Sequence, residues 1–95
     1  MSDVDECVGP VLEAGETAAA VIDAIRSSNA GVEVRDRGAY LRVLVPGRCV
    51  LERAEVERAL GRAFRLPGDL EQVMPSFSGR LRMSGERAVW EAGPR

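Results

Sequence analysis

The sequence contains no histidine and no lysine, and these two absences remove much of the usual chemistry of enzymes. Histidine is the commonest general base and the commonest protein ligand of metals. Its absence excludes histidine-dependent acid–base catalysis and histidine ligation of a metal. All thirteen cationic side chains are arginine, which excludes Schiff-base catalysis and the lysine of a phosphate-binding loop. The composition therefore favours a binding protein over an enzyme.

Cysteine and long apolar runs are also scarce. The 95 residues contain only Cys7 and Cys49, whereas a small secreted domain usually carries about four to eight cysteines. No apolar run approaches the roughly 20 residues of a membrane span, and the acidic first residues differ from a signal peptide. We therefore expect a soluble, cytoplasmic protein with reduced thiols. The net charge of −2 argues against a general nucleic-acid surface.

The patterns that are present predict one α+β domain. Residues 1–7 are polar and acidic and predict a flexible N-terminal tail, and residues 8–95 predict a single compact domain. The expected order is β-α-β-β-β-α-α-β-β, an antiparallel sheet with two to three helices packed on one face, partly ferredoxin-like.

Three helices are predicted. Apolar residues recur at helical spacing from Ala18 to Ile25, with Thr17 as the expected N-cap and Asn29 or Gly31 as a left-handed C-terminal cap. A second helix is expected over 53–60, ended by Gly61, with its buried residues at Val56, Ala59 and Leu60. Asp69 is expected to cap a short third helix that Pro75 stops.

The strands are predicted from alternation and turns. The first is expected near 7–14, interrupted by Gly9-Pro10. Period-two patterns over 32–35, 40–45 and 48–51, separated by turns that contain glycine, predict a three-stranded meander. Two further strands are expected over 77–83 and 87–92, with Trp90 as the largest apolar anchor.

No motif in the sequence carries a catalytic, cofactor or metal site. The glycines form no phosphate-binding pattern, and the carboxylates at Glu52, Glu55 and Glu57 are explained by an acidic helix start. Cys49 is expected to be a core residue, because no histidine can activate it. Arginines gather on the meander and on the last hairpin: Arg35, Arg37, Arg42, Arg48, Arg80, Arg82 and Arg87. They either solubilise strand exteriors or form a protein-docking face, where arginine is enriched.

Five short motifs, in order along residues 8–92, resemble a known family. They are Val8-Gly9-Pro10 with Ala14-Gly15; Asn29; Val34-Arg35-Asp36-Arg37 with Ala39-Tyr40-Leu41-Arg42-Val43; Leu60-Gly61-Arg62 with Phe64; and Ser76-Phe77-Ser78-Gly79. The family is that of the effector proteins, also called coupling or regulatory proteins, of bacterial multicomponent diiron monooxygenases (MmoB/DmpM-like). Ala30 stands where many relatives have proline, and the N-terminal tail is short. The short tail, together with the Gly9-Pro10 and Leu60-Gly61-Arg62 stretches, resembles the toluene, alkene and phenol branch.

The resemblance implies a non-catalytic protein without a cofactor, whose partner is the diiron hydroxylase component. It implies that binding remodels the hydroxylase active site and increases turnover and coupling, with a free protein that is monomeric. The residues that it implicates in docking are Asn29, Ser76, Phe77, Ser78 and Gly79, followed by Val8, Gly9, Pro10, Arg37 and Tyr40.

Alternative interpretations stay open at this point. A small ferredoxin-like module that senses a ligand or binds a protein would use a similar order of strands and helices. For the glycines and Pro10, backbone geometry alone is a sufficient explanation, and Tyr40 fits a half-buried strand position. A small enzyme is the least favoured class.

Overall fold

The computed structural model describes residues 6–93. The elements along the chain are β1 (Cys7–Glu13), α1 (Glu16–Ser28), β2 (Glu33–Asp36), β3 (Tyr40–Pro46), β4 (Arg48–Glu52), α2 (Arg53–Leu60), α3 (Gly68–Val73), β5 (Ser76–Ser78), β6 (Arg80–Met83) and β7 (Arg87–Glu91). The α+β class, the three helices and the antiparallel pairing are confirmed. The tail expected over residues 1–7 falls mostly outside the described residues, but Cys7 is already the first residue of β1.

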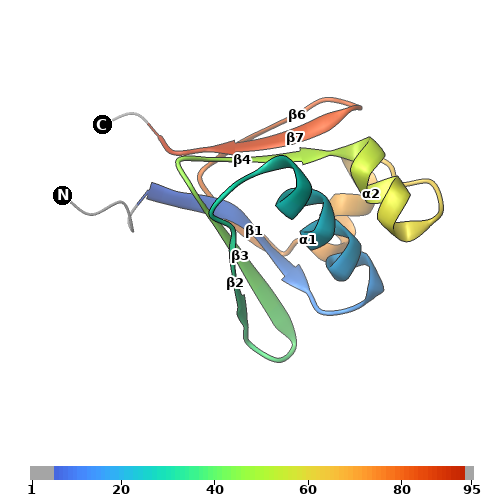
Figure 1. Cartoon of the computed structure of the whole chain (residues 1–95), viewed down its shortest axis with the longest axis horizontal. Coiled ribbons are helices and arrows are strands. Elements are labelled where there is room, and N and C mark those ends of the chain that lie inside the picture. Colours follow the sequence, from blue (N-terminus) through green and yellow to red (C-terminus); the bar gives the residue numbers. More distant parts are fainter. Residues whose placement is uncertain (1–5, 94–95) are drawn as a thin grey trace.

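The strands form two antiparallel sheets instead of one. The first sheet has the order β2-β3-β1-β5, and the second has the order β4-β7-β6. Figure 1 shows β4, β6 and β7 together along one side of the molecule, and α1 and α2 pack against each other and against β4. No helix within residues 6–93 is long and apolar enough to span a membrane.

The predicted meander is wrong at its third strand. β3 pairs with β2 and β1, but β4 leaves for the second sheet and pairs with β7. The turn between them is held from both sides, because the Gly47 N–H donates to the Glu6 carbonyl and the Gly47 carbonyl accepts from the Ala92 N–H. Cys49 then stands opposite Trp90, so the apolar residues of β4 are buried against β7 instead of β3.

The strand predicted over 77–83 is broken at Gly79 into β5, which pairs with β1, and β6, which pairs with β7. Gly79 has a φ of 100°, and a Cβ there would lie 2.7 Å from Val8 Cγ1 and 2.9 Å from the Glu91 carbonyl oxygen. Only glycine combines this backbone angle with such close neighbours. The chain therefore passes from one sheet to the other within a single residue.

Helix α1 forms as its periodicity predicts, with Ala18, Val21 and Ile25 buried along one side. Its ends differ from prediction. The helix begins at Glu16 after Gly15, without a side-chain cap, so Thr17 lies inside the first turn and the predicted Thr17 cap is wrong. Asn29 is extended, with a φ of −141°, and a left-handed φ of 71° belongs to Gly31.

Helix α2 has the predicted bounds, and Gly61 ends it as expected, with a φ of 76° and its N–H donating to the Glu57 carbonyl at 2.8 Å. Val56 is buried and Leu60 half-buried, but Ala59 is exposed, contrary to prediction, because α2 contacts α1 and β4 along a narrow stripe.

In α3, Pro67 already has a helical ψ and the helix begins at Gly68. The predicted Asp69 cap is therefore wrong.

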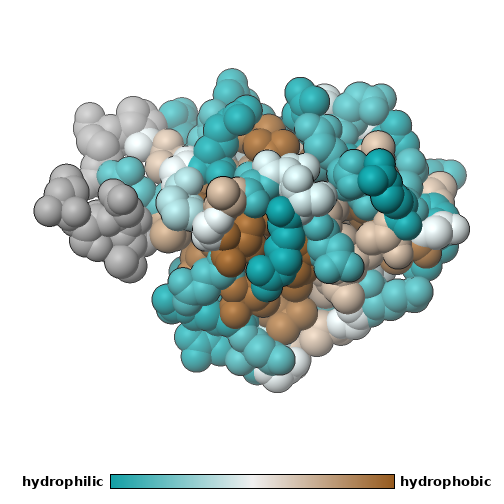
Figure 2. All heavy atoms as spheres, viewed as in Figure 1, coloured by the Kyte–Doolittle hydropathy of each residue, from teal (hydrophilic) through white to brown (hydrophobic). Residues whose placement is uncertain are grey.

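The core lies between the two sheets and the helices. Trp90 is the largest fully buried side chain, and its Nε1–H has no hydrogen-bond partner among residues 6–93. Seen from the side of α1, the surface in Figure 2 is mostly hydrophilic, with apolar atoms showing through near the middle of the molecule. A single small core of this kind is what a chain of this length can build.

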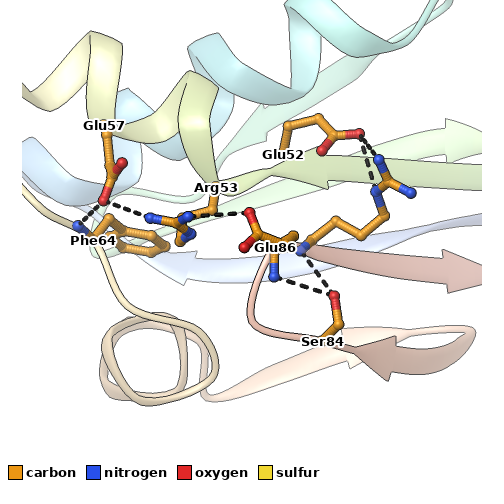
Figure 3. Close-up of polar contacts among 7 residues, drawn as sticks. Glu52, Arg53, Glu57, Phe64, Ser84 and Glu86 are labelled. Carbon is orange, nitrogen blue, oxygen red and sulfur yellow. Dashed lines mark hydrogen bonds and ion pairs between the residues drawn. The ribbon is translucent and has the colours of Figure 1, made fainter.

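A polar network ties α2 to the end of the second sheet (Figure 3). The Arg53 guanidinium donates to Glu57 and to Glu86, each at 3.0 Å, and Glu57 also accepts from the Phe64 N–H. The hydrogen bond to Glu86 is the main reason that the pKa of Arg53 lies above its ordinary value. The network fixes the start of α2 against the β6–β7 turn.

Candidate docking surface

The structure brings two of the predicted docking motifs together. β1 and β5 pair in antiparallel register, with Gly9 opposite Ser78 and Pro10 opposite Phe77. Val8 lies against Gly79, where a Cβ would touch the Val8 side chain. Segments almost seventy positions apart in the sequence therefore form one edge of the first sheet.

Several of these residues have roles within the fold. Gly9 has a φ of 147°, and a Cβ there would collide with the Val43 carbonyl oxygen. Val8 and Pro10 are buried. We conclude that Gly9 and Gly79 are required by close approach of the backbone, as the structural interpretation of these glycines expected.

A hollow of about 500 Å³ lies beside this edge, on the outer face of the first sheet. Buried Val8 and Leu44 contribute apolar surface to it, and Ser78 and Gly79 contribute small side chains. Its other lining residues are Glu6, Cys7, Glu33, Arg35, Arg42, Ala92 and Gly93. The lining thus combines apolar, small and charged residues, as protein interfaces do.

Phe77 and Tyr40 are the large apolar residues exposed within residues 6–93, at 44% and 43%. Successive residues of a strand face opposite sides, so Phe77 faces away from Ser76 and Ser78. Tyr40 shares the face of β3 that carries Arg42 and Leu44, and therefore extends the surface around the hollow. Both aromatic rings are available to a partner.

Arg37 belongs to the β2–β3 hairpin. Its backbone N–H donates to the Tyr40 carbonyl at 2.8 Å, and its side chain is exposed. Arg37 is not among the residues that line the hollow. The hairpin instead places Arg37 close to Tyr40.

Asn29 lies apart from this surface and has an internal role. Its Nδ2 donates to the Ile25 carbonyl at 2.7 Å and to the Val50 carbonyl at 2.8 Å, and its Oδ1 accepts from the Val50 N–H at 3.0 Å. These bonds join the end of α1 to the middle of β4. The structure therefore explains Asn29 as a residue that holds two elements together.

Comparison with known proteins gives the family. Residues 6–91 match the MmoB/DmpM family. The chain belongs to this family. It is 45% identical over 93 residues to the effector subunit of the alkene monooxygenase system of Xanthobacter autotrophicus (strain ATCC BAA-1158 / Py2), covering 95% of this chain and 91% of the relative.

Two solved structures share the MmoB/DmpM fold seen here. One belongs to a phenol hydroxylase–regulatory protein complex, with a TM-score of 0.81 at 18% identity, covering 93% of this chain and 99% of the other. The other is regulatory protein B of soluble methane monooxygenase, with a TM-score of 0.70 at 24% identity, covering 98% of this chain and 69% of the other. The fold is thus kept while most of the residues differ.

Sequence reasoning missed several residues of the hollow in this MmoB/DmpM chain. Arg35 and Arg42 were noted in the arginine pattern and in a family-like motif but not as docking residues, and Leu44 was noted only as a strand residue. The signal was available, because the period-two pattern over 40–45 puts Tyr40, Arg42 and Leu44 on one face. The share of Ala92 and Gly93 in the hollow could not be read, since it depends on how β7 ends beside β1.

No group of His, Cys, Asp and Glu side chains within residues 6–93 is arranged to hold a metal ion. Burial raises the pKa of Cys49 to about 12, so this thiol stays protonated at neutral pH. A protonated, buried thiol is a poor nucleophile. Cys49 is therefore a core residue, as predicted.

Proposed function

We propose that this chain is the effector subunit of an alkene monooxygenase system. It would bind the diiron hydroxylase component, act as a regulatory and non-catalytic partner, and increase turnover and coupling. The observation that carries the proposal is the 45% identity to the Xanthobacter effector subunit over nearly the whole of both chains. Residues 8–95 form the effector domain in this proposal.

The mechanism is differential binding. A protein that holds no reactive group can change a partner's reaction only by binding one state of that partner more tightly than another. A preference of about 100-fold corresponds to about 2.7 kcal/mol of coupling free energy. The effector would thereby shift the hydroxylase toward the conformation that it binds.

The surface around the β1–β5 edge supports this mechanism. It offers a hollow lined by the small residues Ser78 and Gly79, with exposed Tyr40 on the same face of the sheet and exposed Phe77 on the other side of the edge strand β5. A standard interface takes about 800 Å² from each partner, and this protein exposes 5526 Å². A small part of the molecular surface is therefore enough for docking, and a monomer can supply it.

The cytoplasm is the proposed location. Only two cysteines occur in 95 residues, which fits a reducing compartment better than a disulfide-rich extracellular one. Within the system, we expect a short alkene to be the substrate, with toluene and phenol as the alternatives. The pocket that selects among them belongs to the hydroxylase.

A reconstituted assay tests the proposal. The purified protein is titrated into the hydroxylase, ferredoxin and reductase of the same source, and both product formed and NADH consumed are measured with a short alkene and with toluene. We expect a several-fold rise in turnover that saturates near one effector per active site, with more product per NADH. An unrelated small acidic protein serves as the control.

A flat response from a demonstrably active hydroxylase would contradict the proposal. The alternative of a ligand-sensing module would then be favoured, because the hollow is large enough for a small molecule.

A further inference from the structure

The outer face of the second sheet carries an excess of positive charge. Its charged residues, named here the basic face, are Arg48, Glu52, Arg80, Arg82, Arg87 and Glu91. The register places them on the side opposite the buried Cys49, Leu51 and Trp90. Four arginines against two glutamates leave two positive charges uncompensated on one face of a chain whose net charge is −2.

The ion pairs of this face do not neutralise it. Glu91 is shared by Arg82 at 2.9 Å and Arg48 at 3.3 Å, and Glu52 pairs with Arg87 at 3.1 Å. Arg80 stands opposite Glu91 in the ladder but has no ion pair among residues 6–93. Neighbouring like charges repel in the free protein. An anionic partner would reduce this repulsion between the arginines of the basic face.

The basic face has the build of a protein interface. The arginine side chains are well exposed, 60% for Arg48 and 76% for Arg82. In the middle of the face half-buried Val50 stands opposite buried Val89, between the charged pairs. Exposed arginine is enriched at protein interfaces.

The basic face is continuous with the docking surface. Gly79 joins Ser78, which lines the docking hollow, directly to Arg80. Ala92 lines both that hollow and a second one of about 350 Å³ formed with Arg80, Leu81 and Arg82. A partner seated on the docking hollow would therefore extend over Arg80 and Arg82.

We propose that the basic face binds an acidic surface of the hydroxylase beside its contact with the docking hollow, and that this charge contact speeds association. The inference rests on the proposed function and deepens it, by assigning a charge to the partner's surface and a kinetic role to arginines that lie outside the hollow. Charge pairing across an interface acts mainly on the association rate and weakens as salt rises.

The test compares association rates of matched charge variants. The variant R80Q/R82Q removes two positive charges from the basic face. The control R26Q/R65Q removes two exposed arginines, at the end of α1 and before α3, that have no ion pair among the described residues. Binding to the intact hydroxylase is followed by stopped flow from about 20 to 500 mM salt.

We expect R80Q/R82Q to associate about tenfold more slowly than the wild type at low salt, with a flatter salt dependence, while R26Q/R65Q stays within twofold. R80K/R82K, which keeps the charge, should restore most of the rate. Equal rates and salt slopes for the two glutamine variants would overturn the inference, as would a loss of rate that lysine does not restore. Melting temperatures confirm that each variant is folded.

Failure of the inference is distinguishable from failure of the proposed function. If the wild type neither binds nor stimulates the hydroxylase, the proposed function fails. If the wild type does both and R80Q/R82Q behaves like its control, only the role of the basic face fails. Salt-sensitive binding of the wild type to duplex DNA through the same two arginines would also overturn it.

Discussion

The outer face of the first sheet is distinguished by a hollow, whereas the outer face of the second sheet is distinguished by its arginine and glutamate side chains. The β2-β3-β1-β5 sheet brings glycine, serine and buried apolar side chains around a hollow, and an ion pair at the hollow joins Arg35 to Glu33 at 2.7 Å. The β4-β7-β6 sheet covers its outer face with arginines that share two glutamates. Both sheets turn apolar inner faces to one core.

The difference teaches how one small domain can separate two tasks of binding. Close fit at a hollow slows dissociation, because packed contacts must be broken before the partner leaves. Charge on an open face acts earlier, while the partner approaches. Since the two sheets meet at Gly79, both tasks can be met by one continuous surface.

The largest effect that we expect comes from the first sheet. Gly9→Ala should lower the free energy of unfolding by about 3 kcal/mol, because the new Cβ collides with the Val43 carbonyl oxygen at a φ of 147°. Urea unfolding measures the change. Gly47→Ala is the control, since Gly47 also has a positive φ but nothing lies within 4 Å of its Cβ position, and it should lose only about 1 kcal/mol. Equal losses would mean that the close approach of β1 to β3 is not what requires glycine.

The next largest effect concerns Asn29, which links α1 to the second sheet. Asn29→Ala leaves the Val50 N–H and carbonyl without their side-chain partner, and should cost about 2 kcal/mol of stability. Stimulation of the hydroxylase per folded molecule should not change. The exposed neighbour Ser28→Ala should alter neither quantity. A loss of stimulation with unchanged stability would return Asn29 to the docking surface.

Substitution of Phe77 tests whether the edge strand β5 of the first sheet contacts the partner. Phe77→Ala should weaken binding to the hydroxylase about tenfold, as truncation of an aromatic interface residue often does. Its unfolding free energy should fall by far less than that of Phe64→Ala, because Phe64 is 2% exposed and Phe77 is 44% exposed. Titrations of hydroxylase activity and melting curves for both variants decide this. Stability that falls alone would make Phe77 a core residue.

The smallest effect is a pH-dependent change in stability, and it comes from Cys49 on the inner face of the second sheet. Cys49 has a pKa of about 12 when folded and 9.0 ordinarily, so above pH 9 the unfolded chain loses a proton that the folded chain keeps. Its contribution to stability is therefore complete below pH 9 and declines as the pH rises toward 12. At pH 10 the loss should be about 1 kcal/mol. The variant Cys49→Ala should lack this pH-dependent part of the decline in urea unfolding.

Sequence reasoning reached most of the elements and the β2–β3 and β6–β7 hairpins, but not the division of the strands between two sheets. The periodic run from Ala18 to Ile25 identified α1, since burial of one helix side leaves a clear trace in sequence. That β4 pairs with β7 could not be read, because alternation shows which residues face inward and not which strand lies beside them. The split at Gly79 was missed for a related reason. Alternation continues through Phe77, Gly79 and Leu81, although the chain changes sheets there.

The candidate surface was found in part. The resemblance pointed to the motifs around Gly9 and Phe77, and the structure places them side by side. It also pointed to Asn29, whose side chain the fold uses internally. A short motif records that a residue type is needed, whereas only the packing around it distinguishes support of the fold from contact with a partner.

The single tryptophan has a practical consequence. Trp90 is the chain's one indole and is fully enclosed, with its N–H unpaired among residues 6–93. A fluorine label on this ring would give one NMR line from the centre of the molecule. A partner that only covers the outer faces should leave that line in place, whereas a partner that loosens the effector itself should move it. The same ring that completes the core can thus tell whether regulation reshapes one protein or both.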